Sequence, residues 1–239
     1  TLGITSAGAV TDSGTLAVTG ATTISASGQD ITLDQAASTF GTLALTGANV
    51  AVTDAGATDL GASTVSGTLG ITSAGAVTDS GTLAVTGATT ISASGQDITL
   101  DQAASTFGTL ALTGVNVAVT ENAATDLGAS TVSGTFAITS GGAITDSGTQ
   151  AITGDATFTN TAGTDAAITL DDASNAFGGT VTFATDSGSA VTIVDTTALD
   201  LKALTAASLS ATIGGAVTDS GTLAIAGATT ISASGQDIT

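Results

Sequence analysis

The 239-residue chain carries twenty acidic residues against a single cation, Lys202, and its net charge of −19 makes nucleic acid and anionic membrane surfaces unfavourable direct partners. It contains no His, Cys, Tyr, Trp or Arg, which excludes disulfides, imidazole or thiolate metal sites and Ser-His-Asp catalysis. It has no proline and no run of eighteen apolar residues, so backbone ladders are favoured and membrane insertion is not expected.

An internal repeat organises the chain. The stretch GTLAVTGATTISASGQDITLDQAASTFGTLALTG at residues 14–47 recurs letter for letter at 81–114, and Thr1 is copied at Thr68 and Thr135. In the third copy the interval from Ile144 to Val217 is longer than the interval from Val77 to Ile144, and part of the added length falls in 160–167.

We therefore predict one continuous solenoid, a fragment of a longer chain. Its segments are repeat 1 at 1–67, repeat 2 at 68–134, a longer, divergent repeat 3 at 135–207 and the start of repeat 4 at 208–239.

Short alternating segments predict β-strands throughout each repeat. They read aliphatic, small or hydroxyl, aliphatic, polar, and they are bounded by Gly, Ser, Asp or Asn, which are residues that form turns. In chain order, the clearest examples in repeat 1 are LGIT at 2–5, LAVT at 16–19, ITLD at 31–34, LALT at 43–46 and VAVT at 50–53.

Each repeat can be divided into three coils of about 22 residues, with about three short strands in each coil. This is the pattern of an all-β, right-handed parallel β-helix, in which each strand pairs with the equivalent strand one coil above, at a spacing of about 4.8 Å. Inward side chains would form aliphatic ladders worth about 1.5–3 kcal/mol per buried residue. The expected ladder residues are Leu2, Ile4, Val10, Leu16, Val18, Ile31, Leu33, Leu43, Leu45, Val50, Val52, Leu60 and Val65.

Three further side chains have a predicted place in this core. Phe40 and Phe107 follow a short excursion in the second coil, and we expect both to fold back and cap the local core. Gln150 replaces a ladder leucine, so we expect its amide to be hydrogen-bonded inside or twisted out near a corner.

The remaining catalytic chemistry is that of paired carboxylates, as in glycoside hydrolases. Asp171 and Asp172 form the one adjacent acidic pair, whereas Asp12 is a position copied in every repeat. An active site is normally singular, so we expect Asp171 and Asp172 to form a solvated turn and the chain not to be an enzyme. No catalytic or cofactor-binding residue is predicted.

A calcium site is the alternative use of the acidic residues. Asp12, Asp34 and Asp59 follow one another at intervals close to the length of one expected coil, so they could share a corner of successive coils, and oxygen ligands suit calcium. The simpler interpretation is that aspartate makes turns, and neither the GGxGxD nor the EF-hand pattern occurs. These three are therefore weak metal candidates.

The stretch GTLAVTGATTISASGQDITLD at 14–34, together with GASTVSGTLGITSAGAVTDSG at 61–81, resembles the repeat regions of giant filamentous-haemagglutinin-like bacterial surface proteins. The resemblance extends over nearly the whole chain. It implies a right-handed parallel β-helical fibre that is exported across the outer membrane by a partner transporter and serves in adhesion, biofilm formation or contact between cells.

The sequence thus predicts a structural function, as part of the shaft of an extracellular, secreted fibre or adhesin at the cell surface. The expected partners are adjoining repeats or further copies stacked end to end into filaments, and a host or neighbouring cell surface. The alternative is a β-helical module that binds glycan or calcium. Threonine-rich faces also suggest an ice-binding function, but coils of unequal length disfavour it. The strict alternation disfavours a disordered or amyloid-prone chain.

Overall fold

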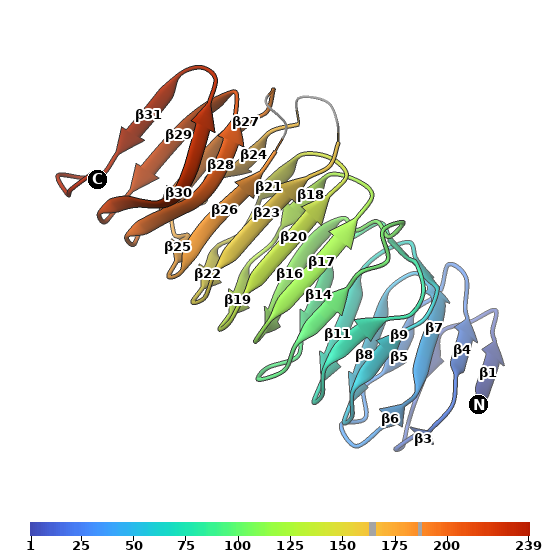
Figure 1. Cartoon of the computed structure of the whole chain (residues 1–239). Coiled ribbons are helices and arrows are strands. Elements are labelled where there is room, and N and C mark those ends of the chain that lie inside the picture. The colour runs from blue at the N-terminus through green and yellow to red at the C-terminus, as the bar shows by residue number, and fades with distance from the viewer. Residues whose placement is uncertain (163–165, 186–187) are drawn as a thin grey trace. The chain divides into compact units, whose positions relative to one another are not determined.

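The computed structural model describes residues 1–162, 166–185 and 188–239, which form two compact units. Unit 1 comprises Thr1–Val115 and Val119–Glu121, and unit 2 comprises Asn116–Ala118 and Asn122–Thr239. Within each unit the paired strands are parallel and no described residue is helical (Figure 1). This confirms the prediction of an all-β chain whose parallel strands stack as a β-solenoid.

Unit 1 contains two main sheets, called sheet A and sheet B. Sheet A orders β1 (Leu2–Thr5), β4 (Thr22–Ser25), β7 (Thr42–Gly47), β9 (Thr58–Leu60), β12 (Val77–Asp79) and β15 (Ile98–Leu100), and it includes β10 (Ser63–Val65) and β13 (Leu83–Val85). Sheet B orders β2 (Val10–Thr11), β5 (Ile31–Leu33), β8 (Val50–Asp54), β11 (Leu69–Ser73), β14 (Thr89–Ser92) and β16 (Thr109–Gly114). A small separate sheet pairs β3 (Ala17–Val18) with β6 (Thr39–Phe40), and β17 (Val117–Glu121) contributes residues to both units.

Unit 2 is built in the same way from two parallel sheets. The first orders β20 (Phe136–Ser140), β23 (Ala156–Asn160), β26 (Thr180–Ala184), β28 (Leu199–Ala206) and β30 (Val217–Ile225). The second orders β18 (Thr125–Leu127), β21 (Ile144–Asp146), β24 (Ile168–Leu170), β27 (Ala190–Asp195), β29 (Ser208–Ile213) and β31 (Thr229–Ser232), and it includes β19 (Ser130–Val132), β22 (Gln150–Ile152) and β25 (Ala176–Phe177).

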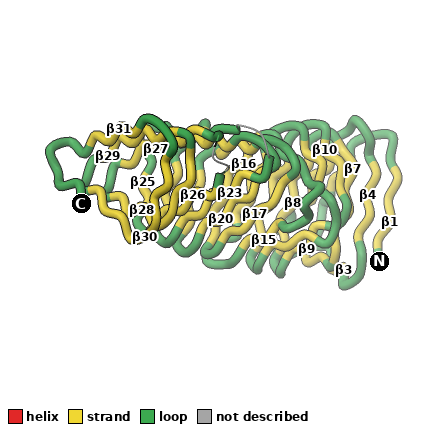
Figure 2. The backbone as a smooth tube through the Cα atoms, turned by 45° about the horizontal axis from the view of Figure 1, so that its top comes forward, coloured by secondary structure: helices red, strands yellow, loops and turns green. Residues whose placement is uncertain are grey.

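Each strand pairs with the strand one turn further along the chain. In unit 1 the turns differ in length: the step from Leu43 to Leu60 is among the shortest, and the step from Ala17 to Thr39 is among the longest. One side of a turn is either a single strand or two short strands with a bend between them, since β9 and β10 both pair with β7. A turn therefore contains two or three strands, which lie along its sides while loops form its corners (Figure 2).

One repeat occupies about three and a half turns. Leu2, Thr22, Leu43 and Leu60 follow one another in register, so three turns of sheet A extend from Leu2 to Leu60. Leu69, the copy of Leu2, comes soon after Leu60 in the chain and lies in sheet B. The strands of repeat 1 thus reappear in the opposite sheet: β2 belongs to sheet B and its copy β12 to sheet A, and β7 belongs to sheet A and its copy β16 to sheet B.

The expected layout of three whole coils per repeat is refined by this register. The corners differ in length, because residues 34–38 form an excursion between β5 and β6, whereas only 55–57 separate β8 from β9. The turns contain fewer residues on average than the expected coil of about 22 residues. One repeat therefore extends half a turn beyond three turns.

The inward positions form aliphatic columns. The expected ladder residues Ile31, Leu33, Leu43, Leu45, Val50, Val52, Leu60 and Val65 are at most 3 % exposed. In the first turn, Leu2, Ile4, Val10, Leu16 and Val18 are only half-buried. Their copies Leu69, Ile71, Val77, Leu83 and Val85 have turns on both sides and are at most 3 % exposed.

The less regular positions also point inward. Phe40 and Phe107 are buried, as expected for caps of the local core. Gln150 is fully buried, and its Nε2 donates to the carbonyl oxygens of Gly128 and Gly148 at 2.9 and 2.7 Å. In the added length at 160–167, residues 163–165 lie outside the described residues, and Asn160 donates from Nδ2 to the Ala166 carbonyl oxygen at 2.7 Å.

Candidate functional site

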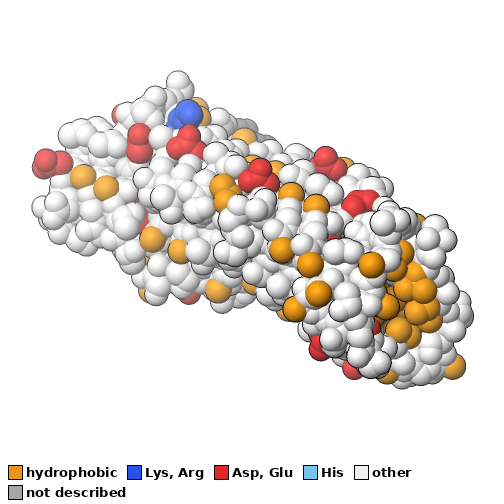
Figure 3. Space-filling view, turned by 90° about the horizontal axis from the view of Figure 1, so that it is seen from below, with side chains coloured by type: hydrophobic (Ala, Val, Ile, Leu, Met, Phe, Trp, Pro, Cys, Tyr) orange, Lys and Arg blue, Asp and Glu red, His pale blue; other side chains and the backbone are white. Residues whose placement is uncertain are grey.

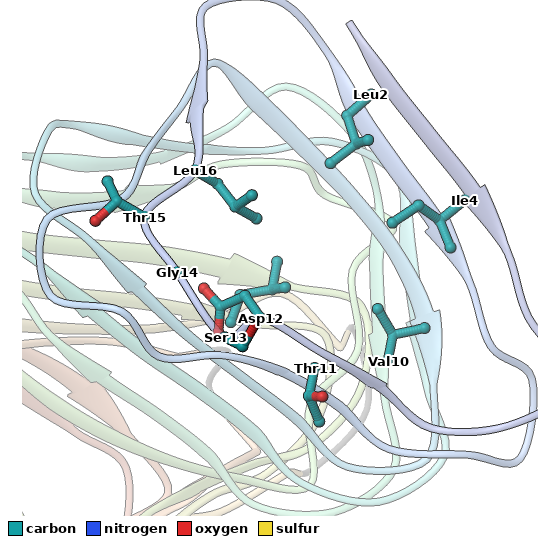
Figure 4. A pocket seen from close by; sticks show the side chains of 10 residues that line it. Leu2, Ile4, Val10, Thr11, Asp12, Ser13, Gly14, Thr15 and Leu16 are labelled. Carbon is teal, nitrogen blue, oxygen red and sulfur yellow. The ribbon is translucent and has the colours of Figure 1, made fainter.

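One pocket is the interior of the first turn, with a volume of about 380 Å³. Leu2, Ile4, Val10 and Leu16 point into it, and Asp12 lies at its edge (Figure 4). Seen from below, apolar side chains also gather at this end of unit 1 (Figure 3). The copies of these four aliphatic residues in repeat 2 form closed core, so the pocket has the chemistry of a stacking surface and not of a ligand site.

In repeats 1, 2 and 3 the aspartate that is copied with the repeat binds backbone of the next turn. Asp12 Oδ1 accepts the Asp34 N–H at 3.0 Å, and Asp79 Oδ1 accepts the Asp101 N–H at 2.8 Å. Asp146 Oδ1 likewise accepts the Asp171 N–H at 2.8 Å. The side chain thus satisfies an amide at the bend where a strand ends.

Burial shifts the titration of two of these carboxyls. Loss of solvent raises the pKa of Asp79, and the N–H donors of Asp101 and Gln102 offset this only in part. Burial also raises the pKa of Asp146, against hydrogen bonds from Asn175 and the Asp171 backbone. Both pKa values therefore reflect a structural carboxyl that is partly desolvated.

The three calcium candidates do not form one cluster. Asp12 and Asp34 lie on successive turns, as their spacing predicts. Asp59 lies instead in β9, where its Oδ2 accepts the hydroxyls of Thr42 and Ser80 at 2.7 and 2.8 Å. Over residues 1–162, 166–185 and 188–239, no group of three acidic side chains is arranged to hold a metal ion.

The acidic pair Asp171–Asp172 forms a turn. Asp172 Oδ1 accepts the Ser174 N–H at 2.9 Å and the Thr149 hydroxyl at 3.1 Å, while the backbone of both aspartates donates to Asp146. This arrangement is the solvated turn that the sequence favours, closed by side-chain to backbone hydrogen bonds.

A second acidic position lies inside the solenoid and was missed by the sequence analysis. Asp54, Glu121 and Asp195 occupy the same place in repeats 1, 2 and 3 and are at most 3 % exposed. Glu121 Oε2 accepts the Phe107 N–H at 3.0 Å, and Asp54 Oδ1 accepts the Gly56 N–H at 2.8 Å. The signal was present in the pattern, because Asp54 continues the inward alternation of β8.

Only one oxygen of the inward Asp195 carboxyl is hydrogen-bonded within the described part of the chain. Its Oδ1 accepts the N–H and hydroxyl of Thr197, both at 2.8 Å, whereas its Oδ2 has no hydrogen-bond partner in the described part of the chain. Burial raises the pKa of this carboxyl, which the hydrogen bonds of Thr197 and Phe177 counteract. The Asp195 carboxyl group holds the backbone of the corner that follows β27 by hydrogen bonds, and it does not face solvent.

A third set of buried polar groups binds backbone amides. Ser38 Oγ and Ser105 Oγ accept the N–H groups of Leu16 and Leu83, both at 3.0 Å. In repeat 3 the serine is replaced by Asn175, whose Oδ1 accepts the Gln150 N–H at 2.7 Å. No sequence signal pointed to this role, because each serine lies in an excursion without alternation.

The outer surface carries dispersed charge. Acidic side chains lie singly on the face in Figure 3, and the one blue side chain is Lys202. Its Nζ lies 3.9 Å from Asp155 Oδ2, and both side chains are more than half exposed, so the pair contributes little. Hydrogen bonds from Thr180, together with Lys202, lower the pKa of Asp155.

Comparison with known proteins agrees with the repeat architecture. None of the described residues forms a helix long and apolar enough to cross a membrane. No curated protein and no solved structure shows significant similarity to the chain. A family model described as repeats of unknown function (DUF5649) matches residues 1–46, 47–113, 114–184 and 188–239, and the match at 47–113 is as long as repeat 1. The chain therefore belongs to the family of repeats of unknown function (DUF5649).

Proposed function

We propose that this chain is a structural segment of the shaft of an extracellular bacterial fibre or adhesin. Its partners are adjoining repeats of the same polypeptide or further copies stacked end to end. In this proposal the backbone ladders transmit length and stiffness, and no residue has a catalytic role. A host or neighbouring cell surface is contacted by other parts of the fibre.

The observation that carries the proposal is the half-turn register of identical sequence. Residues 14–47 and 81–114 have the same letters and occupy opposite sheets, yet they bury the same positions, as with Ile24 and Ile91. A new copy can therefore pair with the preceding one without a specialised interface. Such a unit lends itself to lengthening by duplication, which is what a shaft requires.

Two further features support a shaft. The recurring polar side chains, including Asp79 and Ser105, are engaged in holding backbone at corners. The outer positions of sheet B, such as Gly70, Thr90 and Ala111, are small or hydroxyl-bearing, which suits a solvated and non-adhesive side. The likeness of 14–34 and 61–81 to haemagglutinin-like repeats supports placing this shaft at a bacterial cell surface.

The test is to change the number of repeats. One or two additional copies of residues 1–67 are inserted after Gly67, and the longest dimension of the particles is measured by electron microscopy and small-angle scattering. Each copy is expected to add about 17 Å, from three and a half turns of about 4.8 Å. A scrambled insert of the same length and composition is the matched control and should not lengthen the particle by this step.

Two outcomes contradict the proposal. One is a longest dimension that does not grow with copy number. The other is saturable binding of the chain to a glycan array or to calcium, which would favour a binding module. Localisation is tested separately by adding protease to intact producing cells, since an intracellular repeat protein would survive.

A further inference from the structure

Unit 2 contains an aromatic cluster that repeats 1 and 2 lack. Phe158 in β23 lies at its centre, with ring centroids 5.9 Å from Phe136, 6.0 Å from Phe177 and 5.7 Å from Phe183. The first two contacts are edge-to-face and the third is stacked, which are the geometries that aromatic pairs favour. All four rings are at most 1 % exposed.

The cluster joins successive turns and both sides of the core. Phe136, Phe158 and Phe183 come from β20, β23 and β26, which pair in that order, and Phe158 is in direct register with Phe183. Phe177 comes from β25, which pairs with β22 in the second sheet of unit 2. One central ring therefore connects strands that are far apart in the sequence, from Phe136 to Phe183.

Phe177 occupies the position of Phe40 and Phe107, whereas the other three cluster positions are aliphatic in the earlier copies. Leu69 stands where repeat 3 has Phe136, Ile91 where it has Phe158, and Leu112 where it has Phe183. Repeat 3 also has Ala156 in place of Thr89, whose fully buried hydroxyl has no hydrogen-bond partner among the described residues. The core of repeat 3 thus gains aromatic contacts and is without this unsatisfied hydroxyl.

Near-identical repeats raise a folding problem that this cluster can solve. In a stacked array each turn contacts its neighbours, and folding can begin wherever local interactions are strongest. Residues 14–47 and 81–114 are identical, so neither stretch is intrinsically favoured as a start and each can compete for the same partners. The four rings meet in a single register, which removes this ambiguity.

We propose that the Phe158 cluster is the folding nucleus of the solenoid, formed within unit 2 before unit 1 acquires its structure. Folding then spreads by adding turns to strands that are already in register. Repeat 3 diverges from the other copies because it starts the array, and its role is conformational.

The test compares two substitutions at one repeat position. Phe158→Ile installs the residue of the other copies, and Ile91→Ala truncates the equally buried side chain in repeat 2 as the matched control. Phe158→Ile is expected to slow refolding about tenfold with little change in unfolding, whereas Ile91→Ala mainly accelerates unfolding. Should Phe158→Ile fail to fold, Phe183→Leu is measured with the same expectation.

Pulsed hydrogen exchange during refolding supplies a second readout. Amides of β23 and β26 should be protected before those of β4 and β14. The proposal is overturned if unit 1 is protected first, if refolding of Phe158→Ile or Phe183→Leu matches the wild type, or if Ile91→Ala slows refolding as much as the variant in the cluster.

Discussion

Replacing Thr89 by valine should stabilise the solenoid, although it removes a polar group. Thr89 is fully buried and lies in register between Leu69 and Leu110 on the neighbouring turns. Its Oγ1 has no hydrogen-bond partner among the described residues, and Thr22 is in the same situation in repeat 1. The hydroxyl has lost its water without gaining an acceptor, which is destabilising.

The magnitude follows from two effects. An unsatisfied buried polar group costs about 1–3 kcal/mol, and valine would place a methyl group, worth about 0.8 kcal/mol when buried, in nearly the same volume. Both residues are β-branched and favour strands, so backbone preference changes little. We expect a gain of about 2–4 kcal/mol.

Native-state hydrogen exchange is the assay, because a stacked solenoid can open locally and one global unfolding energy can miss the effect. Exchange of amides in β11, β14 and β16 should slow about thirtyfold to a thousandfold in Thr89→Val. Thr90→Val is the matched control, since Thr90 faces outward beside Gly70 and Ala111, and it should change stability by less than about 0.5 kcal/mol. Unchanged or faster exchange in Thr89→Val, or equal slowing in both variants, would refute the reasoning.

Two further predictions concern the carboxyls. Burial raises the pKa values of Asp79, Asp146 and Asp195, so their stabilising contribution is complete below the unfolded value of about 3.9 and is lost as pH rises through the folded values. The melting temperature should therefore rise from pH 7 towards pH 4, and Asp195→Asn should reduce this rise; a steady fall on acidification, or an unchanged rise in the variant, would contradict the assignment. The second prediction is that a chelator leaves the melting temperature unchanged, because Asp12 binds the Asp34 amide and Asp59 binds two hydroxyls; a calcium-dependent increase would show a metal site.

Local alternation allowed much of the core to be predicted. Ile31, Leu33, Val50 and Val52 are inward because side chains alternate along each strand, and this holds whichever sheet the strand joins. Alternation also places Asp54 inward, but no role was predicted for this residue. The structure shows that a carboxylate is tolerated there because it accepts a backbone N–H at the corner.

The arrangement of the three calcium candidates was predicted less well, because it depends on the number of residues in each turn. Asp12 and Asp34 are brought together by a step close to the length of the expected coil. Asp59 is not, because the next turn is shorter and the register places Val52 above Leu33, so that Asp59 falls beyond the following corner. Corner lengths result from packing between turns, which a single repeat of sequence does not reveal.

The half-turn offset between successive repeats argues against a function confined to one face of the solenoid. Any binding residue that is copied with the repeat, such as Thr23 in β4 and its copy Thr90 in β14, is displayed on sheet A in one copy and on sheet B in the next. A flat ligand contacting one face would meet the same residues only every second repeat. Tandem duplication of this unit therefore cannot build a dense one-sided array, whereas it preserves the backbone ladder and the inward columns at every step. Those shared features are what a load-transmitting shaft uses, so the register itself favours that function over a glycan- or ice-binding surface.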